Sequence, residues 1–257
     1  MDRVVIVTGG TSGIGQATAR KFLKNGDRVV VVSNDPKEKA DAAIEQLKQY
    51  GEVSYHFCNI TSREECEKTV QFAAEKYGRV DILANVAGVT GKRQPFLDGD
   101  LDDTIKVIDI NLMGTIYMSL FAAREMVKRH RGVIINVGSI CGYLANSEAI
   151  GYHVSKGGVK MLTQALAREL TPQGLRVVSV APGWVNTGLM DQKAIEYGGK
   201  LHMKGRVVEP DEIANVIYLL SLDEASAING TTVMADDGYT VFKGLNMKPQ
   251  IVDDGKQ

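Results

Sequence analysis

The sequence predicts an α/β fold: a single domain whose doubly wound parallel sheet carries helices on both faces. Short runs rich in β-branched residues alternate with longer amphipathic stretches along the whole chain. Such alternation is typical of βαβ units, whose strands lie parallel in one sheet. No repeat, low-complexity segment or Pro/Gly/Ser-rich linker interrupts it. We therefore expect one domain over residues 1–242 and a polar C-terminal tail over residues 243–257.

Seven segments are expected to form the sheet. The second of them contains Val29–Val32, a continuous aliphatic run that suits a strand buried on both faces. The first begins close to Met1, so no signal peptide is expected before it. In chain order the expected strands are Val4–Thr8, Arg28–Ser33, Val53–Phe57, Ile82–Ala84, Val133–Val137, Arg176–Ala181 and Thr232–Ala235.

The stretches between these strands have the apolar spacing of amphipathic helices. A helix after each strand would cover both faces of the sheet, as parallel sheets require. The expected helices are Gln16–Lys24, Pro36–Tyr50, Arg63–Tyr77, Leu101–Arg129, Tyr152–Leu170 and Pro210–Leu220.

Composition argues against several classes of function. The net charge of -1 gives no indication of nucleic acid or an acidic membrane as a partner. No apolar run approaches the roughly 18 residues that a membrane span needs. The three cysteines lack metal-ligand spacing, so we expect no metal site. A reduced, cytoplasmic environment is the simplest interpretation.

A glycine-rich turn follows the first expected strand and opens a helix. Gly9, Gly13 and Gly15 would allow a tight turn and a close approach of a pyrophosphate to backbone N–H groups. Ser12 and Ile14 would complete this contact at the helix N-terminus. The spacing is GxxxGxG rather than GxGxxG, and a glycine turn without a ligand is the alternative.

The end of the second strand is expected to distinguish NAD from NADP. An acidic residue there binds the adenosine ribose hydroxyls, whereas an arginine accommodates the 2′-phosphate of NADP. The turn contains Asn34 and Asp35 and no arginine. Lys37 and Lys39 could reach a phosphate, although both also fit a helix surface. The sequence therefore favours NAD, with NADP as the alternative.

Tyr152 and Lys156 are spaced to share one face of an expected helix. A phenol is a poor acid or base at neutral pH, because its ordinary pKa lies near ~10. A neighbouring ammonium stabilises the phenolate and lowers that pKa towards the working range. The spacing is common, so by itself it also fits a surface pair.

The order of several motifs places this pair in a context. The glycine loop is followed by Asn85–Gly88, Asn111, Ser139, the Tyr–Lys pair and Pro182–Gly183. From Arg3 to about Gly238, this order resembles the short-chain dehydrogenase/reductase family, whose shorter form of roughly 250 residues suits one α/β domain. The resemblance implies a Rossmann-type fold and an NAD(P)-dependent oxidoreductase that interconverts a secondary alcohol and a ketone.

The resemblance implies catalytic roles for four side chains. Ser139 would donate a hydrogen bond to the reacting oxygen and stabilise the negative charge that develops there. Tyr152 would exchange a proton with the same oxygen. Lys156 would bind the nicotinamide ribose and lower the pKa of Tyr152. Asn111 would hold Lys156 through a water molecule.

The resemblance also implies further contacts with the cofactor. Asn59 and Ile60 would reach the adenine, although the family commonly has aspartate where this chain has Asn59. Val86 replaces the second asparagine of the motif that starts at Asn85, which alters packing more than chemistry. The other residues implied in cofactor binding are Asn85, Gly88, Tyr152, Lys156, Gly183, Val185 and Thr187.

The segment from Thr187 to about Arg206 is expected to form a substrate lid. An apolar and aromatic opening would suit a hydrophobic or ring-bearing substrate, such as a hydroxysteroid, a bile acid or a 3-oxoacyl chain. The expected substrate residues are Ser139, Cys141, Tyr143, Trp184 and Met190. Leu101–Arg129 and Tyr152–Leu170 correspond to the helices that pair subunits in the family, so a homotetramer or dimer is implied.

Three alternatives remain open. A polyol or sugar dehydrogenase of the same family would need a more polar pocket. The epimerase and dehydratase branch usually carries a TGxxGxxG loop and a larger C-terminal domain, and this sequence has neither. A non-catalytic dinucleotide sensor would be expected to lose Ser139, Tyr152 or Lys156, and all three are present.

Overall fold

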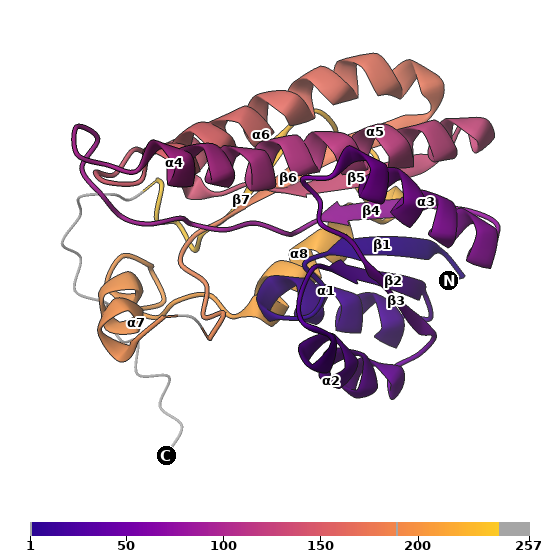
Figure 1. The fold of residues 1–257 in the computed structure, drawn as a ribbon, viewed down its shortest axis with the longest axis horizontal. Coiled ribbons are helices and arrows are strands. Elements are labelled where there is room, and N and C mark those ends of the chain that lie inside the picture. Colours follow the sequence, from indigo (N-terminus) through magenta and orange to yellow (C-terminus); the bar gives the residue numbers. More distant parts are fainter. Residues whose placement is uncertain (1, 189, 242–257) are drawn as a thin grey trace.

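The computed structural model describes residues 2–188 and 190–241, whose strands form a seven-stranded sheet (Figure 1). Neighbouring strands are parallel, in the order β3-β2-β1-β4-β5-β6-β7. The chain order reverses between β1 and β4, and ligands of such sheets bind outside the carboxyl ends of the strands at this point. The predicted Rossmann-type fold class is confirmed. The polar tail expected at 243–257 lies outside the described residues.

The expected strands are all present, with small differences at their ends. Three strands are longer than predicted by one or two residues, because pairing with a neighbour continues past the aliphatic run that marks them in the sequence. The bounds are β1 Val4–Thr8, β2 Arg28–Ser33, β3 Val53–Phe57, β4 Ile82–Asn85, β5 Gly132–Val137, β6 Leu175–Pro182 and β7 Thr232–Ala235.

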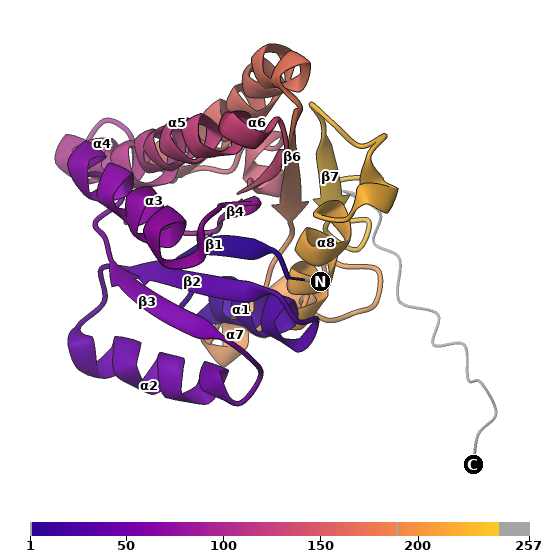
Figure 2. The ribbon, with the colours of Figure 1, turned by 90° about the vertical axis from the view of Figure 1, so that its right-hand side faces the viewer.

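The helices form two layers, one on each face of the sheet (Figure 2). Helices α3, α5 and α6 cover one face, and α1, α2 and α8 cover the other, each layer enclosing its own apolar core. Helix α7 lies in the expected lid. The bounds are α1 Gly13–Lys24, α2 Lys37–Lys48, α3 Arg63–Tyr77, α6 Ile150–Leu170, α7 Gln192–Gly199 and α8 Pro210–Leu220.

The long helix expected over Leu101–Arg129 is interrupted. It consists of α4 (Leu101–Ile108), a π-helical turn (Asp109–Met113), α5 (Gly114–Met126) and a short 3₁₀ turn. Hydropathy and length alone would allow this stretch to cross a membrane, but α5 packs in the core against the sheet. The spacing of apolar residues does not predict the π-turn, because such a turn adds one residue to the helix without changing which residues are apolar.

Candidate active site

Helix α6 carries Tyr152 and Lys156 at the carboxyl end of the sheet. Lys156 is 5% exposed, and its Nζ donates a hydrogen bond of 2.8 Å to the carbonyl oxygen of Val137, the last residue of β5. The same Nζ lies 5.7 Å from the ring centroid of Tyr152. The two side chains are therefore neighbours in an environment from which water is largely removed.

The electrostatics of this pair differ from the expectation. Burial raises the pKa of Tyr152, a hydrogen bond with Ser139 opposes the rise, and the net direction is upward. Burial also lowers the pKa of Lys156 to about 8. In the protein alone the desolvation of the phenol prevails and the ammonium is bonded to Val137, so the lowering of the Tyr152 pKa by Lys156 stays a prediction for the cofactor-bound site.

Ser139 lies just beyond β5 and begins a short 3₁₀ turn, Ile140–Gly142. Its side chain is buried, and its Oγ accepts a hydrogen bond of 3.1 Å from the backbone N–H of Cys141. Because a hydroxyl has one hydrogen to donate and two lone pairs, this contact leaves the O–H of Ser139 available as a donor. Ser139 also lies close enough to Tyr152 to lower the pKa of its phenol, against the larger effect of burial.

Asn111 is positioned by the π-turn, a feature that recurs at functional sites. Its side-chain amide makes two hydrogen bonds of 2.8 Å with the backbone of Val89. Asn111 Nδ2 donates to the carbonyl oxygen of Val89, and Asn111 Oδ1 accepts from the N–H of Val89. Nδ2 also lies 3.0 Å from Ser155 Oγ. A Cβ added to Gly88 would lie 3.0 Å from Asn111 Oδ1 and 3.5 Å from Lys156 Nζ, so Asn111 and Lys156 meet around this glycine.

The glycine loop between β1 and α1 has the geometry of a phosphate cradle. Gly9 and Gly13 adopt φ values of 67° and 50°, and a Cβ on Gly15 would overlap the carbonyl oxygen of Gly9. Ser12 is the N-cap of α1, but its side chain makes no capping hydrogen bond. The first N–H groups of α1, including that of Ile14, therefore remain for a ligand, as an anion at this position requires.

Asp35 lies beside the glycine loop, at the end of β2. One carboxylate oxygen accepts a hydrogen bond from the hydroxyl of Thr11, and the other lies 2.8 Å from Lys39 Nζ. Partial burial raises the pKa of Asp35, but the hydrogen bonds from Lys39 and Thr11 prevail and hold it below its usual value. Asp35 is thus an ionised acceptor, as binding of ribose hydroxyls requires. Asn34 beside it is exposed.

The two residues expected at the adenine differ in what they offer. Ile60 is buried against Gly114, where an added Cβ would lie 2.7 Å from its side chain. Asn59 Oδ1 accepts hydrogen bonds from the N–H and the hydroxyl of Thr61, at 3.2 and 2.9 Å. The acceptor oxygen that we expected to reach the adenine therefore stabilises a local turn, although its remaining lone-pair capacity and its NH₂ group stay available.

The motif at the end of β4 supports the sheet rather than the ligand site. Asn85 is 4% exposed, and its Nδ2 donates to Ser119 Oγ and Asn136 Oδ1 at 3.0 and 2.9 Å. The N–H groups of Val86 and Ala87 both donate to Thr8 Oγ1, which joins this turn to β1. The Nδ2 group of Asn85 is thus used within the sheet, whereas its buried Oδ1 has no hydrogen-bond partner among the described residues, so a cofactor contact of Asn85 stays a prediction.

The loop after β6 crosses towards the glycine loop. Val185 is buried and pairs with Val208 across the base of the expected lid. A Cβ on Gly13 would lie 3.3 Å from Thr187 Cβ. Thr187 therefore lies against the phosphate cradle, whereas Gly183 lies against His202 and Asp236, and Val185 is held by Val208.

The expected substrate residues differ in their local surroundings. Trp184 meets the ring of Tyr197 edge-on at 5.8 Å, and Met190 is half-buried. Cys141 lies next to the Ser139 hydroxyl, and burial raises the pKa of its thiol. Tyr143 is 42% exposed, with Lys160 Nζ 4.3 Å from its ring centroid, so it lies at the rim rather than in the interior.

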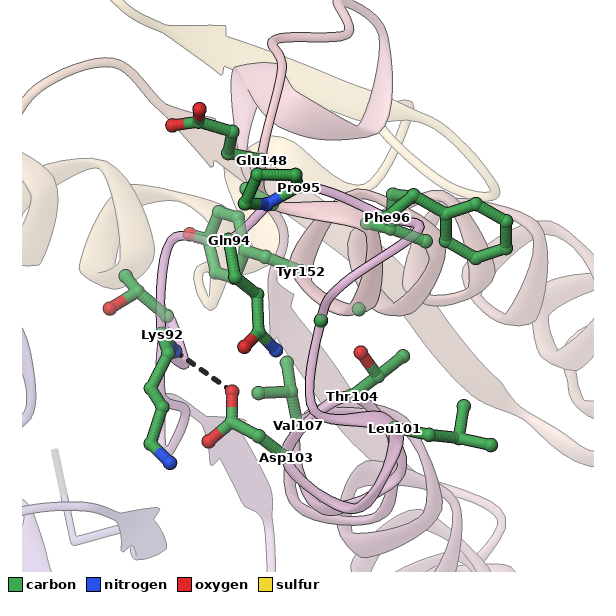
Figure 3. A pocket seen from close by; sticks show the side chains of 15 residues that line it. Lys92, Gln94, Pro95, Phe96, Leu101, Asp103, Thr104, Val107, Glu148 and Tyr152 are labelled. Atoms are coloured by element: carbon green, nitrogen blue, oxygen red, sulfur yellow. Dashed lines mark hydrogen bonds between the residues drawn. The ribbon is translucent and has the colours of Figure 1, made fainter.

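A small pocket of about 60 Å³ lies beside Tyr152, between the β4–α4 loop, α4 and the start of α6 (Figure 3). Its wall mixes apolar side chains such as Val107 with polar ones such as Gln94 and Thr104. A larger cavity of about 530 Å³ lies at the opposite ends of the strands, remote from this chemistry. We therefore assign the smaller pocket to the candidate active site.

Several neighbours of the site were not expected from the sequence. The β4–α4 loop has no apolar spacing that indicates a pocket, and Tyr239 and His202 carry no motif. Thr11 could have been found, because a hydroxyl inside the glycine loop is close to the turn at Asp35. Within residues 2–188 and 190–241, no group of three His, Cys, Asp or Glu side chains could hold a metal ion.

Comparisons with known proteins agree with the motifs. The family model described as short chain dehydrogenase matches residues 3–197. A 3-oxoacyl-[acyl-carrier-protein] reductase of Thermotoga maritima is 32% identical over 93% of this chain and 98% of its own. A meso-2,3-butanediol dehydrogenase of Serratia marcescens is 33% identical over 98% of both chains. The crystal structure of levodione reductase matches with a TM-score of 0.88 at 30% identity, covering 94% of this chain and 98% of that chain.

Proposed function

The chain belongs to the short-chain dehydrogenase family, and on that premise we propose that it is an NAD(P)-dependent oxidoreductase that interconverts a secondary alcohol and a ketone. Oxidoreductases among its relatives support an enzyme of this kind. The observation that carries the proposal is the convergence of Ser139, Tyr152, Lys156 and Asn111 beside a glycine loop whose helix N-terminus is free for a phosphate.

The residues around the cradle fit a dinucleotide. A Cβ at Gly9 or Gly15 would press on the backbone of Ala87 or of Gly9, so the glycines permit the tight turn that brings the start of α1 to the cradle. Ser12 leaves the first N–H groups of α1 uncapped, and Asp35 offers an anionic acceptor. When bound, the nicotinamide would supply or accept the hydride. Lys156 would hold the nicotinamide ribose, and Val185 and Thr187 would hold the carboxamide.

The proton step would belong to Tyr152. Because burial raises its pKa, the phenol is protonated at neutral pH and can donate to the substrate oxygen during reduction. The O–H of Ser139 would bind the same oxygen and stabilise its developing charge. Lys156 would hold the ribose of a bound cofactor, and its ammonium, turned from Val137 towards the phenol, would favour the phenolate in the reverse reaction. Asn111 would hold Lys156 in reach of both groups.

We propose NAD as the preferred cofactor. Asp35 is held ionised by Thr11 and Lys39, and a carboxylate at this position repels the 2′-phosphate of NADP. Lys39 weakens that repulsion, because its ammonium lies 2.8 Å from Asp35 Oδ1. NADP therefore remains a usable second cofactor in this proposal.

The proposed substrate is a carbonyl or secondary alcohol on a hydrophobic or ring-bearing body. We propose that the segment 187–206 is the substrate lid of a single domain. Apolar surface in this segment and beside it comes from Trp184, Tyr197 and Met190. The polar side chains in the pocket beside Tyr152 favour a polyol as the second candidate. The names of the relatives differ in substrate, so they do not decide between these.

A second copy of the chain is the proposed partner. Exposed apolar side chains lie along α4 and α6, on the side away from the sheet, and pairing of these helices would bury them. They are Leu101, Ile105, Val154 and Met161. Nucleic acid and membranes are not proposed partners, and the proposed location is the cytoplasm.

A screen that follows the absorbance of the reduced nicotinamide tests the proposal. Purified protein is offered hydroxysteroids, bile acids, 3-oxoacyl thioesters and polyols, each with NAD(H) and NADP(H). We expect turnover with hydrophobic alcohols or ketones and higher kcat/KM with NAD(H). Absence of turnover, together with absence of dinucleotide binding by calorimetry, would reject an oxidoreductase. Turnover of small polyols alone would select the second candidate.

A further inference from the structure

His202 connects the proposed lid with the loop after β6. The imidazole is 4% exposed and lies against Gly183, where an added Cβ would overlap its Nε2. Its ring also stacks on Tyr239 with centroids 5.9 Å apart. His202 therefore packs between the Pro182–Val185 loop and the C-terminal segment, while its own backbone belongs to the lid.

Both ring nitrogens of His202 bond to the backbone. Nδ1 lies 2.8 Å from the carbonyl oxygen of Gly198, and Nε2 lies 3.3 Å from the backbone nitrogen of Trp184. A carbonyl oxygen can only accept and a backbone N–H can only donate, so Nδ1 must carry hydrogen and Nε2 must offer its lone pair. The packing thus selects one neutral tautomer of the imidazole.

The ionisable groups around His202 are committed to other partners. Asp236, next to Gly183, accepts hydrogen bonds from Thr240 N and Thr240 Oγ1 at 2.8 and 2.5 Å. Asp237 accepts from the backbone N–H of Lys204 at 2.6 Å and lies 4.0 Å from the ammonium of that residue. Tyr197 and Tyr239 supply neutral rings. None of these groups bonds to Nε2, so Trp184 N–H is the group that a proton there would face.

We propose that His202 is a positioning residue whose neutral imidazole holds the backbone of Trp184, and with it the Pro182–Val185 loop, in the shape that binds the nicotinamide end of the cofactor. The inference rests on the proposed function, because this loop matters only if a dinucleotide binds. A proton on Nε2 would put two donors face to face and release the loop. Cofactor affinity should therefore be full while Nε2 accepts from Trp184 N–H and should fall when a side chain without an acceptor replaces His202.

The effect should concern binding of the cofactor and not the chemical step. His202 contacts Gly183, Gly198, Trp184 and Tyr239, and none of these contacts involves Tyr152 or Ser139. Its replacement should therefore raise the KM for the dinucleotide and leave kcat at saturating cofactor within about twofold, because an interaction equal in ground and transition state alters only binding.

Trp184 makes a direct test possible, because it is the single tryptophan of the chain and lies in the loop itself. Binding of NADH, and of NADPH in parallel, is followed at pH 8 by energy transfer from Trp184. The proteins are wild type, His202→Gln, His202→Leu and His130→Gln; His130 is exposed and remote from the site, so its variant is the matched control. Glutamine offers an acceptor oxygen to Trp184 N–H, whereas leucine offers none.

We expect wild type, His130→Gln and His202→Gln to bind the dinucleotide with nearly equal affinity. His202→Leu, which lacks an acceptor, should bind roughly tenfold more weakly, the cost of one lost backbone hydrogen bond. Wild-type affinity in His202→Leu, or equally weak binding by His202→Gln and His202→Leu, would overturn the proposal.

Failure of the proposed function would look different. If neither dinucleotide binds at pH 8, the function is rejected. The emission of Trp184 without cofactor still tests the contact, since it should change in His202→Leu and stay close to that of wild type in His202→Gln. Emission of His202→Leu equal to that of wild type would reject the role of His202 by itself.

Discussion

The two ends of the sheet differ in whether their buried charged side chains have a counter-ion within the described part of the chain. At the amino ends, Asp27 is 2% exposed and bonded to Arg3 at 2.7 Å, and Asp81 bridges Arg79 and Arg129 at 2.6 and 3.0 Å. At the carboxyl ends, Lys156 is 5% exposed and, among the described residues, has no carboxylate within ion-pair distance. Charge is therefore neutralised within the chain at one end and left for a ligand at the other.

This difference separates stability from function. When one partner of a buried ion pair within the chain is removed, the free energy of unfolding falls, because the other partner is left desolvated and unpaired. A buried cation without a counter-ion costs free energy in the folded protein, and such costs cluster at functional sites. Substitutions at the two ends should therefore differ in kind: stability should suffer at the amino ends, and activity at the carboxyl ends.

The largest effect on activity is expected from Tyr152→Phe. Loss of the proton donor should reduce kcat for hydride transfer by about 10³-fold, within the range of general acid–base catalysis, while unfolding changes little. Steady-state rates on the best substrate of the screen, with denaturant unfolding of the same samples, measure both. A variant that keeps more than a tenth of wild-type kcat would remove Tyr152 from the proton step.

The largest effect on stability is expected from Asp81→Ala. This change leaves Arg79 and Arg129 unpaired and the N–H of Val4 without its 2.8 Å acceptor, which should lower the free energy of unfolding by about 3 kcal/mol. Urea unfolding measures this, and kcat of the folded fraction should be unchanged. The matched control is Asp223→Ala, whose exposed pair with Arg131 is worth about 0.5 kcal/mol. Equal losses in both variants would contradict the comparison.

Lys156→Met should raise stability and reduce activity in a single variant. Because burial lowers the pKa of Lys156 to about 8 from 10.5, the unfolded chain binds more protons between these values, and wild-type stability rises with pH across that interval. Below it, the variant should be more stable than wild type by about 2 kcal/mol, after allowance for the lost bond to Val137.

Urea unfolding of both proteins at pH 7 and pH 10 tests this. The difference should shrink towards pH 10, and the variant should bind dinucleotide weakly and turn over slowly. A variant that is less stable than wild type at pH 7 would mean that the cation stabilises the fold, and the contrast between the two ends of the sheet would fail.

A smaller effect is expected at the adenosine end. Asp35→Asn should reduce the preference for NAD over NADP by about tenfold, because one charge-assisted bond to the ribose and the repulsion of the 2′-phosphate are both lost. Calorimetric titration with each cofactor gives the ratio. Thr11→Val removes a partner of Asp35 but not its charge, so its effect should be smaller. An unchanged ratio in Asp35→Asn would assign selection to other residues.

The sequence predicts the fold well because burial on both faces of a parallel sheet leaves continuous aliphatic runs. Val29–Val32 illustrates this, since all four residues are fully buried, and β2 has the bounds expected of it. The π-turn could not be predicted, because it depends on the pairing of the Asn111 amide with the backbone of Val89, which is remote in sequence.

The site residues were predicted by motif, but their electrostatics were not. Spacing places Lys156 beside Tyr152, yet the directions of their pKa shifts follow from burial, which depends on β5 and the rest of the packed site. Residues without a motif, such as His202, were missed for a related reason. Its two backbone partners, Gly198 and Trp184, become neighbours only when the segment after β6 folds back on itself.

The π-turn at Asp109–Met113 has a consequence for how the chain tolerates changes in length. A π-turn holds one residue more than an α-helical turn, so α4 is out of phase with α5 by about 100°, the rotation of one helical residue. Deletion of one residue here would produce a smoother helix and a better local hydrogen-bond ladder. It would also swing α4 and the pocket beside Tyr152 around the axis of α5, so local regularity would be gained at the expense of the site's alignment.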